Sequence, residues 1–177
     1  TIIDANMVTA DFINVKGDFN LSMGGEEELK VQAAMVGLTP TQRDITASYV
    51  SFSGSNVDIY TGFGTPYYGE GDEKDSVGLY MNDVNFAYSS YKQNLLSSNY
   101  LNMKFETFSS TAAQAATVGM DDYLSVTLEE ISINMNTGSS LNPLVDPNID
   151  YIASFDENGK EVIVGDFSIF LDFDQSI

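Results

Sequence analysis

The sequence predicts an all-β protein of elongated shape, built from long, bent antiparallel strands in one curved sheet or in a two-sheet sandwich. Apolar and polar residues alternate along most of the 177-residue chain, which is the pattern of strands with one buried face. The alternation slips by one residue at several points, and turn-forming residues separate the alternating segments. Together these features predict strands, corners and hairpins throughout the chain.

The slips share one form. Apolar positions in residues 77–88 are spaced by two, then by three after Met81, then by two again, and residues 124–135 repeat this after Leu128. One extra residue keeps the apolar side chains on one face only if the strand bulges or bends there. Each unit is therefore expected to be a strand, a corner and a second strand, with both halves facing one core. The expected corners lie near residues 13, 48, 82, 106, 129 and 165, with polar pairs at Asn82-Asp83, Glu106-Thr107, Glu129-Glu130 and Gly165-Asp166.

Turn signals set the expected order of elements. Strands are expected over residues 8–23, 45–52, 57–63, 77–88, 101–117, 124–135, 151–155 and 162–171, with residues 109–117 read as strand rather than helix. Gly24-Gly25 and Thr137-Gly138 are expected to be turns, and Asn158-Gly159 a tight type I′ hairpin joining residues 151–155 to 162–164. The irregular gaps between corners favour a sheet over a regular solenoid, and a wide β-solenoid with variable loops is the alternative.

Composition narrows the function. The chain has seven Lys and Arg and 26 Asp and Glu, a net charge of −19, which argues against nucleic-acid binding and against attraction to anionic membranes. No run of eighteen apolar residues is present, so no membrane-inserted helix is expected, and residues 1–12 do not resemble a signal peptide. The chain lacks Cys and His, which removes thiolate metal sites and the usual general base. Glycoside hydrolysis requires two carboxylates that face one cleft. Adjacent carboxylates such as Glu129 and Glu130 would point to opposite faces of a strand, and we therefore expect that the protein is not an enzyme.

The length fits a single β-rich module over residues 1–177, and a sub-division near residues 90–100 is left open. The chain starts and stops within strand-like alternation. We therefore expect ends that are paired with a neighbouring copy or cut from a longer chain.

Two acidic stretches are candidate calcium sites, because Ca²⁺ prefers several oxygen ligands from a flexible loop. A solvated acidic surface is the more common reason for such stretches. No cofactor is expected other than this Ca²⁺. The candidate ligands are Glu70, Asp72, Glu73 and Asp75 in the first stretch and Asp146 and Asp150 in the second.

An aromatic seam is expected in the segment VDIYTGFGTPYY, which holds Tyr60, Phe63, Tyr67 and Tyr68. These rings suit packing within the chain or against a neighbouring copy, since they combine apolar area with a polar tip, and stacking on sugar rings is the alternative. The closing strand is expected to join the same interface through Phe167, Ile169, Leu171 and Phe173.

The order of several segments over residues 45–175 resembles the tandem repeats of giant bacterial surface or secreted, adhesin-like proteins. The segments are VSFSGSNVDIYTGFGTPYY, an acidic spacer, VGLYMNDVNFAYSSY, LNMKFETFSS, LSVTLEEISINMNTG and VIVGDFSIFLDF. Such repeats carry a Gly-Pro-Tyr-aromatic loop, and here Gly64-Thr65-Pro66-Tyr67-Tyr68 contains an inserted Thr. The resemblance implies an extracellular or cell-surface location and a structural or adhesive role, and it carries over no catalytic residue.

The expected function is therefore a structural or adhesive repeat unit of a long extracellular protein or filament, whose copies associate head to tail. The alternative is a carbohydrate-binding β-sandwich that presents its aromatic loop to glycans.

Overall fold

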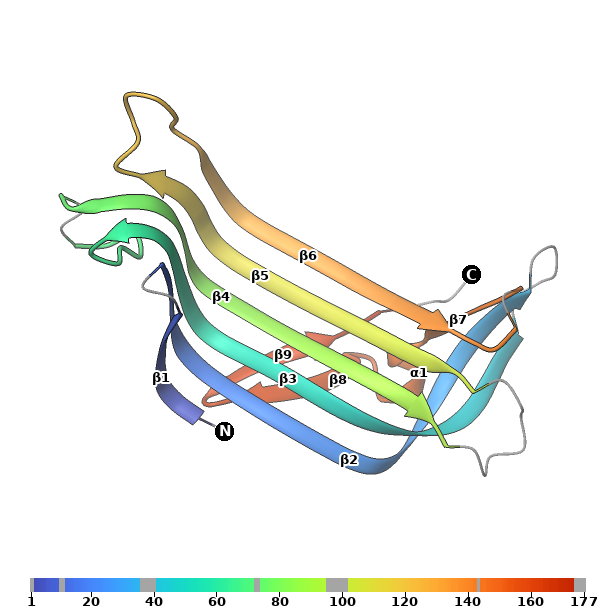
Figure 1. Cartoon of the computed structure of the whole chain (residues 1–177). Helices are drawn as coiled ribbons and strands as arrows, with labels where there is room; N and C mark the ends of the chain where they lie inside the picture. Colours follow the sequence, from blue (N-terminus) through green and yellow to red (C-terminus); the bar gives the residue numbers. More distant parts are fainter. Residues whose placement is uncertain are drawn as a thin grey trace.

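A computed structural model describes residues 2–9, 12–35, 41–71, 74–94, 102–142 and 144–173. Seven strands form one open antiparallel sheet, and a two-stranded hairpin packs on one of its faces (Figure 1). Six strands follow one another across the sheet in sequence order: β1 (Ile2–Thr9), β2 (Ile13–Met35), β3 (Thr41–Gly64), β4 (Ser76–Gln93), β5 (Lys104–Val118) and β6 (Thr127–Ser139). The prediction of an all-β fold with long, bent antiparallel strands in a curved sheet is confirmed, and so is the assignment of residues 109–117 as strand.

The remaining elements lie at one end of the sheet and beneath it. Strand β7 (Val145–Ile149) pairs with residues 31–35 of β2, on the side opposite β3. A single helical turn, α1 (Tyr151–Ser154), leads to the hairpin of β8 (Lys160–Val164) and β9 (Phe167–Leu171). No helix among the described residues is long and apolar enough to span a membrane. Apart from β7, the described strands pair with their sequence neighbours, and they do not form the coils of a solenoid.

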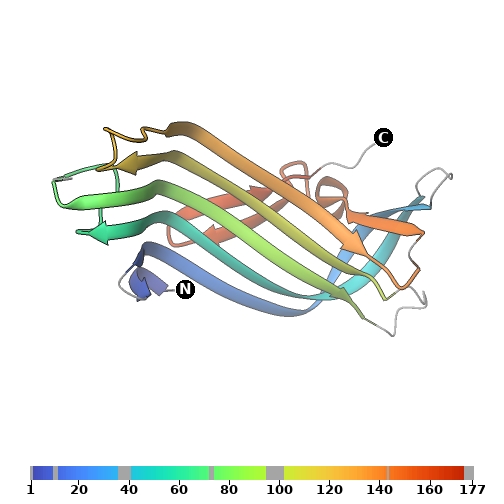
Figure 2. The same ribbon diagram turned by 45° about the horizontal axis from the view of Figure 1, so that its top comes forward.

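The sheet bends along a line that crosses its strands. Gly17 in β2, Asn56 in β3, Asp83 in β4 and Glu130 in β6 have φ angles of +150°, +49°, +50° and +52°. The strand pairing shifts at Gly17, Asn56 and Asp83, so each of these is a β-bulge that turns its strand. At Glu130 the pairing with β5 is interrupted, but its register is kept. The bends stand in line in the sheet, and all its long strands change direction together (Figure 2). The corners predicted near residues 82 and 129 are therefore confirmed.

The other predicted corners differ. Strand β5 passes Glu106 and Thr107 with unbroken pairing to β4, so the corner near residue 106 is wrong. Gly165 and Asp166 form the two-residue turn between β8 and β9, where Gly165 takes a φ of +59°. Residue 13 starts β2 directly after the β1–β2 turn.

Near residue 48 the irregularity lies in the neighbouring strand. Two residues of β2, Gly25 and Glu26, lie opposite the single residue Ser48 of β3. The predicted turn at Gly24-Gly25 is thus a bulge inside the 23-residue strand β2.

The hairpin predicted at Asn158-Gly159 is also wrong. Residues 151–154 are helical because the Asp150 carboxylate caps the turn, accepting a hydrogen bond from the backbone N–H of Ala153 at 2.8 Å. The side chain of Tyr151 is buried in the core, and the hairpin forms instead around Gly165. Asn158-Gly159 belongs to the turn that leads into β8.

The main core lies between the sheet and the β8–β9 hairpin. We call the sheet face that carries the hairpin the inner face, and the opposite one the outer face. Fourteen buried side chains form this core: Leu29, Val31, Ile45, Ala47, Ala87, Tyr91, Met103, Phe105, Ile149, Tyr151, Val162, Val164, Ile169 and Leu171. Most of the sheet's contribution comes from its half beyond the bend, and the hairpin supplies the opposite wall.

Candidate functional site

The outer face carries a broad apolar surface. Strand pairing aligns Leu21, Phe52, Tyr88, Phe108 and Met135 in one row across five strands. Two flanking rows, taken at i−2 and i+2, add further apolar positions on the same face because side chains two apart share a face. We define the apolar face as these ten residues: Phe19, Leu21, Met23, Val50, Phe52, Phe86, Tyr88, Phe108, Ile133 and Met135.

Nothing in the described part of the chain covers this surface fully. Met23 is 71% exposed, Leu21 58% and Ile133 55%, and Val50, Phe52 and Met135 are also exposed. With about 150–250 Å² available per large side chain, these six leave roughly 600 Å² of apolar surface open. That is the upper end of the largest patch on an ordinary monomer, and such patches are often functional.

The rings in this surface pack on one another. Phe19 stacks on Phe52 with ring centroids 6.0 Å apart, and Phe86 lies 5.4 Å from Phe52 and 6.5 Å from Phe108. These contacts hold the aromatic side chains in place across β2 to β5. The surface is therefore ordered in advance, which lowers the entropy lost when a partner binds.

The same face continues past the bend as a small satellite core. Val57, Val84 and Ala112 are buried there, and side chains from both limbs of the strands, such as Met81 and Phe86, pack against them. The two halves of the bent strands therefore face one apolar cluster, as predicted from the three-residue spacing of apolar positions at the bend. That cluster lies on the outer face, however, and not in the main core.

The inner face is opposite in character beneath the hairpin. It presents small or polar side chains where the outer face presents large apolar ones. Ser51, Ser53 and Ser55 of β3 are buried there, and the Ser55 hydroxyl donates to the carbonyl of Val164 in the hairpin at 3.2 Å. The small side chains let the hairpin backbone approach this part of β3 closely, while large side chains such as Phe52 project from the same part of the strand on the outer face.

The sheet also has free edges. No described strand pairs with the edge of β6 that faces away from β5, nor with the edge of β1 that faces away from β2. At its C-terminal end β6 is tied to β7, since the Asn136 side-chain amide donates to the Ile149 carbonyl at 2.7 Å. Residues 127–135 carry no Lys or Pro, the residues that commonly protect an edge strand.

The aromatic seam lies at the far end of the sheet, where the β3–β4 connection folds back. Tyr60 is buried, and its hydroxyl donates to the Phe63 carbonyl at 2.6 Å. Tyr67 packs edge-on against Tyr80 at 5.1 Å, and Tyr68 is half-buried in the same cluster. Three of the four predicted rings are therefore buried or half-buried, whereas Phe63 is 71% exposed and contacts the ring of Phe12 edge-on, with centroids 5.4 Å apart.

The closing strand packs inside the molecule. Ile169 and Leu171 of β9 are buried in the main core, and Phe173 packs against Tyr151 with centroids 5.8 Å apart. These side chains are not available to a neighbouring copy in this fold. Phe167, at the start of β9, is exposed.

The two acidic stretches lie at opposite ends of the sheet (Figure 1). Glu70 and Asp75 are exposed in the β3–β4 connection, and Asp72 and Glu73 lie outside the described residues. Asp146 is exposed on β7, whereas Asp150 is buried and used as the cap of α1. No group of three or more acidic side chains suited to a metal ion occurs among the described residues. Calcium binding stays a prediction.

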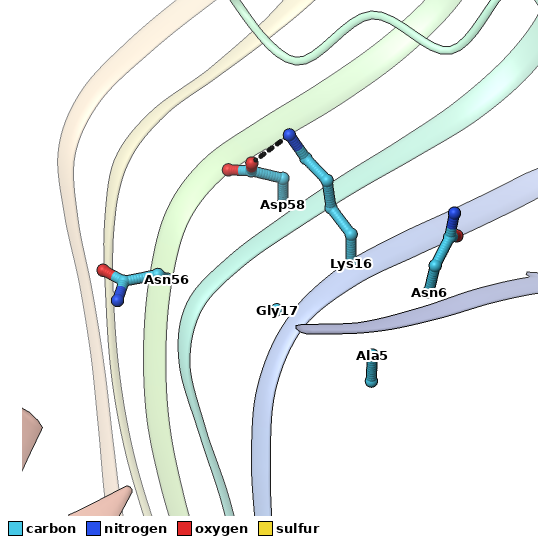
Figure 3. A pocket seen from close by; sticks show the side chains of 6 residues that line it. All are labelled: Ala5, Asn6, Lys16, Gly17, Asn56 and Asp58. Carbon is cyan, nitrogen blue, oxygen red and sulfur yellow. Dashed lines mark ion pairs between the residues drawn. The ribbon is translucent and has the colours of Figure 1, made fainter. Parts of the chain in front are cut away.

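A shallow pocket of about 350 Å³ opens at the bend between β1, β2 and β3 (Figure 3). It is lined by Ala5, Asn6, Lys16, Gly17, Asn56 and Asp58. Lys16 and Asp58 form an ion pair of 3.0 Å across adjacent strands, and the Lys16 ammonium also lies 4.2 Å from the centre of the Tyr68 ring. The two charges neutralise one another, so the pocket offers no free charge to a ligand.

A buried ion pair joins the hairpin to the sheet. The Lys160 ammonium donates to both carboxylate oxygens of Glu27, at 2.7 and 3.0 Å, and to the Tyr91 hydroxyl at 2.8 Å. It also lies 4.0 Å from the centre of the Tyr49 ring, a cation–π contact. The sequence alone does not reveal this ion pair, because Glu27 and Tyr91 lie 133 and 69 residues before Lys160 in the chain.

Two tyrosines extend this network through the core. The Tyr151 hydroxyl donates to the Thr107 hydroxyl at 2.8 Å and is hydrogen-bonded to Tyr91. Burial raises the pKa of both Tyr91 and Tyr151 well above the usual tyrosine value, because a buried phenolate would be poorly solvated. Both therefore stay protonated at neutral pH, and the network is a structural tie rather than a source of acid–base chemistry.

No protein-family model matches this chain, and searches of curated proteins and of solved structures find no significant match either. The candidate sites therefore rest on the geometry alone. The features that distinguish the molecule are the apolar face and the two free edges of its sheet.

Proposed function

We propose that this protein is a structural repeat unit of an extracellular bacterial assembly, and that its copies join edge to edge into an extended array. The observation that supports the proposal is the open sheet, in which one edge of β1 and one edge of β6 have no partner strand among the described residues. Such edges are templates for pairing with another chain.

The two edges are complementary in direction. Strands alternate in direction from β1 to β6, so β1 of the next copy would continue the antiparallel order beyond β6. The surfaces that meet would differ, and a contact of this kind extends as a fibre instead of closing into a dimer. This replaces the closing strand, whose side chains are buried, as the surface through which neighbouring copies meet.

The glycan-binding alternative gains less support from the geometry. Sugar recognition by stacking requires open ring faces, and three rings of the loop pack within the chain. Phe63 alone offers an open ring there.

The test is the assembly state of the chain and of an edge variant. Thr127→Lys with Ser132→Lys adds charge to the free edge strand, and we expect it to abolish fibres seen by sedimentation and electron microscopy at physiological ionic strength. The matched control is Thr111→Lys with Ala113→Lys, which adds the same charge to exposed positions on the neighbouring, non-edge strand β5. A chain that stays a monodisperse monomer at high concentration, or that assembles equally well with the edge variant, would refute the proposal. Glycan-array binding by such a monomer, lost in Phe63→Ser, would favour the alternative.

A further inference from the structure

We propose that the apolar face is covered by a second copy of this chain, packed face to face with its strands antiparallel. This contact is separate from the edge-to-edge pairing and would layer two sheets on one another. It goes beyond the proposed function, since the two contacts use different surfaces.

The area suits a contact between two folded chains. The six exposed side chains leave roughly 600 Å² open, close to the ~800 Å² that each partner buries in a standard protein interface. The row of Leu21, Phe52 and Tyr88 continues across β5 and β6 without a gap, as in the inner layer of a two-sheet sandwich. A second sheet is the natural cover for such a surface.

The charge distribution favours a second copy over other partners. Each copy carries a net charge of −19, so most of its surface repels another copy. The ten residues of the apolar face contain no carboxylate, and Glu106, exposed two residues from Phe108 on the same face, has Lys104 as its next neighbour along that face. An anionic lipid surface would meet the same net charge, without a basic cluster to offset it.

The margins of the face fix the orientation. Lys92 of β4 and Lys104 of β5 are paired cross-strand neighbours, exposed on the outer face four residues from Tyr88 and Phe108 respectively. If the two sheets were stacked with their lysine-bearing ends together, Lys92 and Lys104 of one copy would lie near the same lysines of the other copy and repel them.

A two-fold axis that runs across the strands, along the central row of the apolar face, turns the second sheet end for end and so keeps the lysines of the two copies apart. It places β4 of one copy over β4 of the other and sets the two lysine pairs at opposite ends of the contact. The arrangement is isologous and closes at two copies. It also sets Tyr88 opposite Tyr88 of the partner copy.

The experiment uses the edge variant Thr127→Lys with Ser132→Lys as background, so that pairing of edges does not contribute. Analytical ultracentrifugation from 1 to 200 µM in 0.15 M and 0.5 M NaCl should show a reversible dimer. Adding Leu21→Thr and Ile133→Thr should weaken the dimer at least tenfold, while far-UV circular dichroism stays unchanged. The control, Leu144→Thr with Ile163→Thr, changes equally exposed apolar residues away from the face and should leave the dimer intact.

Crosslinking tests the orientation without relying on the stability of those variants. The chain has no cysteine, so Tyr88→Cys introduces a single thiol at the centre of the face. A short bifunctional maleimide should link two copies through it and should fail to do so with Ile163→Cys. Lys92→Glu with Lys104→Glu should also weaken the dimer.

Three outcomes would overturn the proposal. The first is an edge variant that remains monomeric to 200 µM, and the second is a dimer that Leu21→Thr with Ile133→Thr does not affect. The third is flotation of the chain with phosphatidylcholine vesicles that the same face variant abolishes, which would assign the face to a neutral lipid surface. If the wild-type chain forms fibres and the edge variant forms only dimers, both the edge-to-edge and the face-to-face contact are supported. If the edge variant is only monomeric, the face-to-face contact is refuted, and the edge-to-edge contact is judged from the wild-type chain.

Discussion

The ion pair between Lys160 and Glu27 makes the sharpest prediction about stability. Lys160→Met keeps the length of the side chain but removes three hydrogen bonds and the charge above the Tyr49 ring. It leaves the Glu27 carboxylate next to the aromatic core without its partner. We therefore expect a large loss in the free energy of unfolding.

The magnitude follows from the burial of the pair. Removing one partner of a fully buried pair costs about 3–5 kcal/mol. The side chains of Lys160 and Glu27 are 12% and 22% exposed, so some water reaches them. We take about 3 kcal/mol, roughly a hundredfold change in the folding equilibrium, or a fall of about 6–12 °C in Tm for a chain of this size.

The assay is urea unfolding followed by circular dichroism, with m-values compared between variants. Glu27→Leu combined with Lys160→Met removes both charges, and it should recover most of the loss because no buried charge is left unpaired. Lys16→Met serves as the matched control. Its pair with Asp58 is of similar length, 3.0 Å, but its side chain is 47% exposed, so the cost should stay below about 1 kcal/mol.

Equal costs for Lys160→Met and Lys16→Met would refute the reasoning. The same holds if the double variant is no more stable than Lys160→Met alone. Either result would mean that the pair does not tie the hairpin to the sheet.

Three further predictions concern other parts of the molecule. Between pH 8 and about pH 10 the two buried tyrosines should leave the stability unchanged, and stability should fall above about pH 10. The pKa of Tyr91 and of Tyr151 is raised in the folded state, so unfolding then lets both ionise. Thermal melts from pH 8 to 12 measure this, and a flat profile would contradict it. At the bend, Glu130→Gly should hold or raise Tm, whereas Glu130→Val should lower stability by about 1–2 kcal/mol in urea unfolding, since a β-branched residue resists the φ of +52°. Finally, salt should raise Tm by screening the net charge of −19, and millimolar Ca²⁺ should raise it further if Glu70 and Asp75 belong to an ion site; equal shifts from Ca²⁺ and from NaCl at matched ionic strength would exclude calcium binding.

Much of the fold follows from local pattern. The step of three after Met81 and after Leu128 predicts the bends, because one extra residue must be absorbed by the backbone wherever side chains keep one face. The structure places positive φ angles at Asp83 and Glu130, directly in those steps. The same pattern around Glu106 is misleading, since β5 continues without a bulge.

The candidate site is less predictable. Alternation shows that Phe86 and Tyr88 share one face of their strand, and only the strand pairing brings them onto the same face as Leu21 and Phe52. Both faces of a strand can be covered, and local sequence does not say which one is. In the middle of β3 the hairpin packs on small side chains such as Ser51 and Ser53, and this contact between distant segments decides which face of these strands is covered.

The sequence by itself determines that this chain forms bent β-strands, where several of them turn, and that it carries a large negative charge. Only the tertiary structure decides which face the β8–β9 hairpin covers, which edges remain unpaired, and that Lys160 meets Glu27 from 133 residues away. The physical reason is that alternation and backbone bends are set by neighbours along the chain. Burial, edges and ion pairs depend instead on segments that meet only when the whole sheet has formed.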